Sequence, residues 1–91
     1  MPTPAISVAM SVYNGEGFVA AAVESILAQT CGDFEFLILD DGSSDGSLAI
    51  LQSYAAKDPR IRLFHRENKG LIISLNELIA HATAPLIARM D

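Results

Sequence analysis

The sequence predicts an α/β fold in which four parallel strands form one sheet between layers of helices. Short apolar runs alternate with segments whose apolar residues recur at helical spacing, a pattern typical of βαβ units. Acidic, glycine and asparagine residues follow directly after the apolar runs. The carboxyl ends of parallel strands meet at one edge of a sheet, and ligands bind there in such folds. The sequence therefore predicts both the fold class and the edge of the sheet that carries the site.

The first strand is expected over residues 5–12, where Ile, Val and Met predominate. A helix over residues 16–29 follows, because its apolar residues recur every three or four positions. Gly32 suits a left-handed cap after this helix. The second strand covers residues 34–39, an apolar run that only Glu35 interrupts.

The second half of the chain repeats the alternation of helix and strand. Ser44 and Asp45 suit the N-terminal cap of the next helix. That helix ends before Pro59, because the residue before a proline disfavours helical backbone. The remaining helices are expected over residues 45–57 and 71–82, and the remaining strands over residues 61–65 and 86–90.

The composition indicates one small globular domain over residues 1–91, since 51% of the residues are hydrophobic and 19% are charged. The net charge is −5, residues 1–56 contain no Lys or Arg, and there is no basic run, which argues against nucleic-acid binding. A single cysteine, Cys31, indicates a reducing compartment. No signal peptide or membrane-spanning run is found, so we expect a cytoplasmic protein; peripheral contact with the inner face of the membrane stays open.

Three polar loops and the last residue are expected to converge at the carboxyl edge of the sheet. The loops are residues 13–17, 40–45 and 66–70, and Asp91 follows the fourth strand directly. No glycine-rich dinucleotide fingerprint and no phosphate-binding loop with Gly-Lys-Ser/Thr is present. The site is therefore expected to use carboxylates, hydroxyls and an aromatic ring.

Asp40 and Asp41 are the sharpest feature of this edge, because carboxylates are rare at the end of an apolar run. A turn with a helix cap would explain Asp45 well, but it needs only one carboxylate. We therefore interpret the pair as binding residues, able to accept hydrogen bonds from a base and a ribose or to hold a cation. Tyr13 could stack on a nucleobase or cover the first crossover, and both roles stay open. Arg89 lies close to Asp91 in sequence and could meet a phosphate.

These motifs together resemble the N-terminal, nucleotide-binding half of an inverting family 2 glycosyltransferase, a Rossmann-like three-layer αβα structure called the GT-A fold. The resemblance covers nearly the whole chain, in order and with fitting spacing. The Asp-Asp-Gly-Ser segment after the second strand is its most specific part. The matching segments are residues 6–14, 25–30, 33–45, 68–71 and 87–91.

The resemblance implies that Ser11 and Tyr13 line a nucleobase pocket and that Asp41 accepts from the base. Asp40 would support the pocket or contact the ribose, and Asp91 would open an Asp-x-Asp motif. That motif holds a divalent metal, Mn²⁺ or Mg²⁺, on the diphosphate of the donor. The predicted nucleotide-binding residues are Ser11, Tyr13, Asn14, Asp40, Asp41, Asn68, Gly70 and Arg89, and the predicted metal ligand is Asp91.

The resemblance also implies the activity of a parent protein. Such a protein transfers a sugar from a nucleoside diphosphate donor, here expected to be a uridine diphosphate sugar, to a glycan, lipid or protein acceptor with inversion. A role in bacterial cell-surface polysaccharide biosynthesis is expected. The chain ends at Asp91, before the second Asp of the metal motif and before any catalytic base, so we expect a truncated domain without turnover.

Two other kinds of protein share the alternating pattern. A receiver-like signalling module needs an acidic pair after the first strand and a late lysine, whereas this strand ends in Tyr13-Asn14 and no lysine follows Lys69. A non-catalytic interaction module is the other alternative. An exposed sheet edge invites strand pairing, so self-association of the chain is expected in either case.

Overall fold

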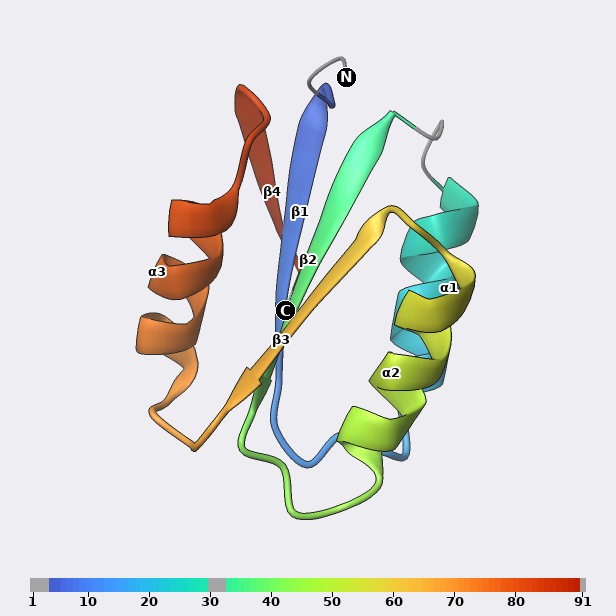
Figure 1. Cartoon of the computed structure of the whole chain (residues 1–91), viewed down its shortest axis with the longest axis vertical. Helices are drawn as coiled ribbons and strands as arrows, with labels where there is room; N and C mark the ends of the chain where they lie inside the picture. Colours follow the sequence, from blue (N-terminus) through green and yellow to red (C-terminus); the bar gives the residue numbers. More distant parts are fainter. Residues whose placement is uncertain (1–3, 30–32, 91) are drawn as a thin grey trace.

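The structure is a computed structural model that describes residues 4–29 and 33–90, and it confirms the expected three-layer α/β arrangement (Figure 1). Its four strands form one parallel sheet in the order β3-β2-β1-β4. Two helices, α1 and α2, cover one face of the sheet, and α3 covers the other (Figure 1). The strands are β1 (Ile6–Val12), β2 (Phe34–Asp41), β3 (Ile61–Arg66) and β4 (Leu86–Met90), and the helices are α1 (Val19–Gln29), α2 (Ser47–Lys57) and α3 (Leu71–His81).

The hydrophobic core is divided unequally between the two faces of the sheet. The larger cluster lies between the sheet and the helices α1 and α2, and β2 is buried along its whole length. The smaller cluster lies under α3. Side chains alternate between the faces along each strand, so odd-numbered residues of β1 and β2 face α3. The smaller cluster consists of the buried residues Ala9, Leu37, Leu39 and Leu78.

Three element boundaries differ by two or more residues from those expected from the sequence, and three others differ by one. The second strand runs on through Asp41, because Asp40 and Asp41 pair with the end of β3. α1 begins at Val19, since the Gly15 carbonyl accepts hydrogen bonds from the Phe18 and Val19 N–H groups in a turn. α2 begins at Ser47, after Gly46 as its N-cap, and not at Asp45. The expected cap at Gly32 lies outside the described residues.

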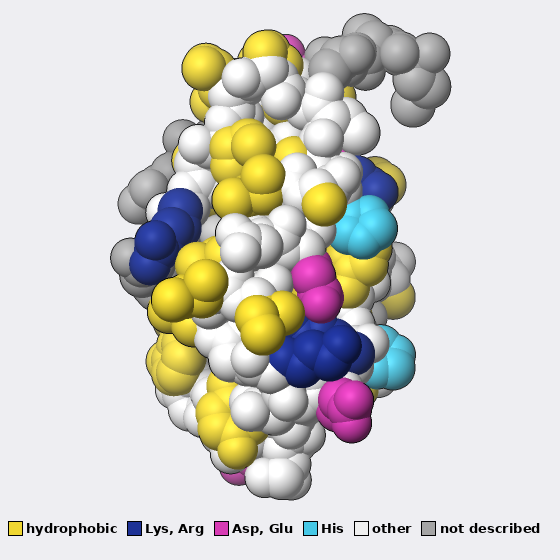
Figure 2. All heavy atoms as spheres, turned by 90° about the vertical axis from the view of Figure 1, so that its left-hand side faces the viewer, with side chains coloured by type: hydrophobic (Ala, Val, Ile, Leu, Met, Phe, Trp, Pro, Cys, Tyr) yellow, Lys and Arg dark blue, Asp and Glu magenta, His cyan; other side chains and the backbone are white. Residues whose placement is uncertain are grey.

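The face that carries α3 and β4 exposes an unusual number of apolar side chains, and Figure 2 shows them spread over that side of the molecule. A groove of about 170 Å³ lies between α3 and β4, with Ala9 of β1 among its lining residues. β4 is an edge of the described sheet and pairs only with β1. No helix in the described part of the chain has the length and apolar character needed to span a membrane. The exposed large apolar residues of α3 and β4 are Leu71, Ile72, Ile73, Ile79, Leu86 and Ile87, of which Leu86 lies on the face that carries α1 and α2.

Candidate functional site

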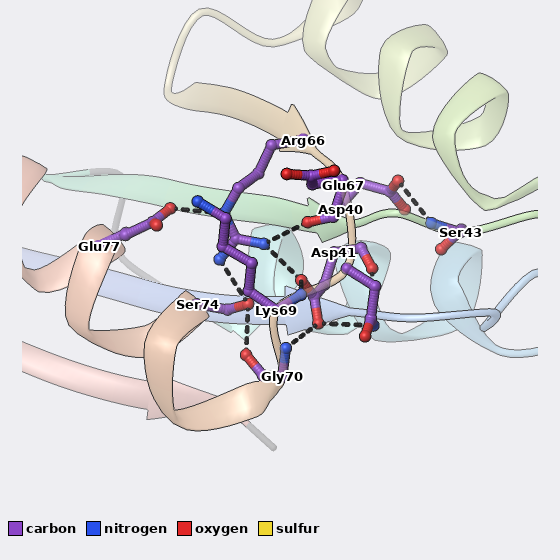
Figure 3. Close-up of polar contacts among 10 residues, drawn as sticks. Asp40, Asp41, Ser43, Arg66, Glu67, Lys69, Gly70, Ser74 and Glu77 are labelled. Carbon is purple, nitrogen blue, oxygen red and sulfur yellow. Dashed lines mark hydrogen bonds and ion pairs between the residues drawn. The ribbon is translucent and has the colours of Figure 1, made fainter.

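The two adjacent aspartates lie on opposite faces of the sheet. Both belong to β2, in which successive side chains point to opposite sides. Asp41 faces α3 and contacts the loop that precedes it, whereas Asp40 faces α1 and α2 and contacts Ser43 (Figure 3). Both are 2% exposed. They therefore form two separate polar sites rather than one paired carboxylate site.

Asp41 anchors the loop between β3 and α3, and Figure 3 shows its carboxylate surrounded by donors. Oδ1 accepts from Arg66 Nη1 at 2.5 Å and from the Lys69 N–H at 2.8 Å. Oδ2 accepts from Asn68 Nδ2 and from the Gly70 N–H, both at 3.0 Å. A carboxylate has about four acceptor positions. The protein thus satisfies this side chain fully, and the loop at residues 66–70 is held to the end of β2.

The charge of Asp41 is matched by Arg66, the last residue of β3 and its register partner. Burial by itself raises the pKa of Asp41, but hydrogen bonds from Lys69, Arg66 and Gly70 outweigh it and lower the pKa below its ordinary value. Arg66 also donates from Nε to Glu77 at 2.8 Å. The site therefore contains an ionised carboxylate at neutral pH. The guanidinium of Arg66, which Asp41 shares with Glu77, holds it in place.

Asp40 holds the turn that follows β2. Its Oδ2 accepts from the Ser43 N–H at 3.1 Å. Its Oδ1 is buried and has no hydrogen-bond partner among the described residues. Through this contact to Ser43, Asp40 fixes the turn after β2 on the side of the sheet that carries α1 and α2.

Two loops on that side interlock by hydrogen bonds in both directions. The Asn14 N–H donates to Ser43 Oγ at 2.8 Å, and the Ser44 N–H donates back to Asn14 Oδ1 at 2.8 Å. Asn14 adopts a positive φ of 49°, a conformation that asparagine tolerates better than most residues. Deeper down, the fully buried Ser47 hydroxyl accepts from the Gly15 N–H at 2.8 Å. The loops after β1 and β2 therefore behave as one unit.

Gly42 lets the third loop approach this unit closely. Its φ is +75°, and a Cβ at this position would lie 2.4 Å from the Asn68 backbone nitrogen. No other residue fits such a position without moving the backbone. The close approach brings Asn68 within reach of Asp41, where its Nδ2 also donates to the Asp41 carbonyl at 3.1 Å.

Three further predicted residues lie on β1, directly after β1 and on β4. Ser11 is partly buried on the α3 side of β1, and Tyr13 is 54% exposed just after that strand. Arg89 pairs in register with Ala9 and lines the groove beside α3. Asp91, the predicted metal ligand, lies outside the described residues. The structure thus brings Asp41, Asn68 and Gly70 together directly, joins Asn14 and Asp40 through Ser43, and leaves Arg89 in the neighbouring groove.

Metal ligation has no support within residues 4–29 and 33–90, where no group of three His, Cys, Asp or Glu side chains could hold an ion. The described residues therefore do not by themselves fit the metal that the resemblance implies.

The sequence motifs did not reveal Arg66, Glu77 or the serines Ser43 and Ser47 as site residues. Arg66 could have been found by aligning the second and third strands in parallel, since Asp41 and Arg66 then become neighbours. The serines give no such signal, because Ser after a strand is common in any turn.

The chain resembles known glycosyltransferases along almost its whole length. The family model described as glycosyl transferase family 2 matches residues 7–91. EpsE of Bacillus subtilis, which carries a provisional glycosyltransferase name, is 44% identical over 90 residues; the match covers 97% of this chain and 32% of EpsE. The chondroitin synthase of Escherichia coli is 36% identical over 97% of this chain and 13% of its own length. The chain thus spans about a third or less of these relatives.

Solved structures with the same fold are glycosyltransferases as well. TarS of S. aureus, residues 1–349 in complex with UDP-GlcNAc, superposes with a TM-score of 0.86 at 23% identity, over 96% of this chain and 26% of TarS. A Pyrobaculum calidifontis mannosyltransferase in complex with GDP-Man and Mn²⁺ gives a TM-score of 0.78 at 24% identity, over 91% of this chain and 26% of that one. These likenesses confirm the expected GT-A architecture. Because the family model accounts for nearly every residue, the chain belongs to glycosyltransferase family 2.

Proposed function

We propose that the chain is the donor-binding part of a longer family 2 glycosyltransferase and that it binds a uridine diphosphate sugar at the carboxyl edge of the sheet. The observation that carries this proposal is the meeting of three loops there, with Asp41 fixing Asn68 and Gly70, and Asn14 joined to Ser44. Parallel sheets bind ligands at this edge. Among the similar structures, TarS forms a complex with UDP-GlcNAc and the mannosyltransferase forms one with GDP-Man, so the titration below compares both bases.

Each predicted residue has a role in this proposal. The exposed ring of Tyr13 stacks on the base, and the Ser11 hydroxyl lies beside it. Asp41 accepts from the base and orients residues 68–70 around the nucleoside. Asp40 supports the turn under the ribose. Arg89, at the side of the edge nearest β4, meets the diphosphate.

The parent enzyme, in this proposal, transfers the sugar with inversion to a glycan, lipid or protein acceptor, in the cytoplasm or at the inner face of the membrane. Polysaccharide synthesis fits the name of the relative chondroitin synthase. None of the residues assigned to the site above acts as the general base for the acceptor hydroxyl in this proposal, so we propose that these residues bind donor without turnover. A divalent metal, with Asp91 as a ligand, would supply Lewis-acid chemistry on the diphosphate.

Titration of the isotopically labelled chain with UDP in magnesium buffer tests the proposal by amide chemical shifts. Shifts are expected at Ser11, Tyr13 and residues 68–70, and none at the opposite end of the sheet. Replacing Tyr13→Ala should weaken binding about tenfold, because stacking of a base on an aromatic ring contributes roughly 1–3 kcal/mol.

Phe18→Ala is the matched control, because Phe18 is 58% exposed and lies near Tyr13 in sequence. It should leave the affinity within about twofold of the unchanged chain. Shifts confined to other surfaces, or equal losses in the two variants, would contradict the proposed site. Tighter binding of GDP than of UDP would support the proposed site but contradict the choice of uridine as the base.

A further inference from the structure

A second buried carboxylate lies at the opposite, amino-terminal end of the sheet. Glu35, the second residue of β2, is 7% exposed. Its Oε2 accepts from Ser7 Oγ at 2.5 Å, from the Thr83 N–H at 2.6 Å and from Thr83 Oγ1 at 3.0 Å. Its Oε1 accepts from Arg62 Nη1 at 3.0 Å. The donors come from β1, β3 and the connection between α3 and β4, so one side chain ties together parts of the chain that are far apart in sequence.

The same cluster holds the connection between α3 and β4 by its backbone. The Ala84 N–H donates to Ser7 Oγ at 3.1 Å, and Arg62 Nη1 also donates to the His81 carbonyl at 2.9 Å. Burial opposes the charge of Glu35, but the hydrogen bonds from Ser7, Thr83 and Arg62 outweigh it and lower its pKa to about 2. The anchor is therefore ionised across the neutral range.

The side chains of β4 bury little surface that could fix its register. Four of its five residues are exposed, and only Met90 packs partly against the main core. A strand with little buried surface specifies its register weakly, and a slip by one residue turns every side chain to the other face. Such a slip would take Met90 off the core and turn Arg89 away from the α3 side. A fixed point at the start of the strand prevents it.

We propose that Glu35 is a positioning residue that sets the register of β4 against β1 through Thr83 and Ser7. In this register Ala9 pairs with Arg89 and Met10 with Met90, so β4 ends beside the residue that precedes Ser11. The consequence of this register for donor binding rests on the proposed function, because the register places Arg89 at the diphosphate end of the proposed site. The register itself does not depend on any ligand.

Amide hydrogen exchange of the nucleotide-free chain, followed by NMR, tests this inference with Glu35→Gln. Glutamine offers one acceptor oxygen in place of two and turns an NH₂ group toward a donor. The amides of β4 should exchange about tenfold faster, while those of β2 and β3 change less than about twofold. Glu67→Gln removes the same charge at an exposed residue and should leave β4 unaffected.

Two outcomes would overturn the inference: unchanged protection of β4, or a uniform loss in all four strands, which would make Glu35 a general stabiliser only. Ser7→Ala is the milder variant if Glu35→Gln does not fold, and it should give the same pattern with a smaller effect. Cross-strand NOEs between Ala9 and residues 88–90 report the register directly and should weaken in the variants. Since no nucleotide is present, failure here leaves the proposed function standing, and a negative UDP titration leaves this inference standing.

Discussion

Two buried carboxylates on the same face of β2 mark the two ends of that strand, Glu35 near its start and Asp41 at its end. Each is surrounded by donors, and each has an arginine of β3 beside it, Arg62 and Arg66. The hydrogen bonds lower the pKa of both groups against the opposing effect of burial. A buried charge is tolerated only when it is paired and hydrogen-bonded. These two residues therefore link the folding free energy to pH.

The pH dependence of stability follows from the direction of the Glu35 shift. Its pKa is about 2 in the folded chain and 4.5 unfolded, so its contribution is present above pH 4.5 and is lost as the pH falls toward 2. The loss amounts to about 3 kcal/mol at most. Urea unfolding at pH 7, 5, 4 and 3 should show the free-energy difference between the unchanged chain and Glu35→Gln shrinking over this range. A constant difference would contradict the assignment.

At the scale of elements, the loops after β1, β2 and β3 are tied to one another and to the end of β2. The first two exchange hydrogen bonds between Asn14 and the serines at 43 and 44, and the third is held by Asp41. Gly42 lies where the second and third loops meet, with the Asn68 backbone directly against it. A small change at this position should therefore disturb the whole edge.

Replacing Gly42→Ala should destabilise the chain by about 2–4 kcal/mol, because the methyl group meets the Asn68 backbone and φ stays positive. Gly17→Ala is the control, since a Cβ there meets nothing within 4 Å. It should change the stability by less than about 0.5 kcal/mol. Urea titration followed by circular dichroism gives both values. Equal effects of the two substitutions would show that the close approach of the loops is not essential.

The sequence predicted the elements well because their apolar spacing is local information. Helical periodicity located α1, α2 and α3, and the position of the acidic and polar residues identified the correct edge of the sheet. The different surroundings of Asp40 and Asp41 were not predicted, because the strand was expected to end at residue 39. Ladder pairing with His65 and Arg66 extends it, and such pairing is a tertiary effect. The anchoring of Thr83 by Glu35 was missed for the same reason, since the two are 48 residues apart.

At the scale of the whole molecule, the two faces of the sheet differ in how completely they are covered. α1 and α2 bury a large cluster, whereas five large apolar side chains on the α3 side, four of α3 and one of β4, are exposed. β4 adds an unpaired edge within the described sheet. Exposed apolar surface beside a free strand edge favours association.

The chain should therefore self-associate, and Ile72→Asp should weaken the association. Ile72 is 76% exposed, so a charge there costs little folding free energy. Gln52→Asp places the same charge on exposed α2, on the other side of the sheet, and should have no effect. Sedimentation velocity over a wide concentration range measures the outcome. A monomer at all concentrations, or equal behaviour of the two variants, would exclude association through this face.

Four protein donors already surround the Asp41 carboxylate. A ligand can therefore hydrogen-bond to this carboxylate only by replacing one of the protein's own hydrogen bonds. Both oxygens already accept two hydrogen bonds each, from Arg66, Asn68, Lys69 and Gly70. A ligand N–H directed at Asp41 must displace one of them, so the free energy gained is the difference between two similar hydrogen bonds. A ligand without a donor at that point leaves the protein's own bond intact. Asp41 would then discriminate between bases while adding little to the affinity for any of them.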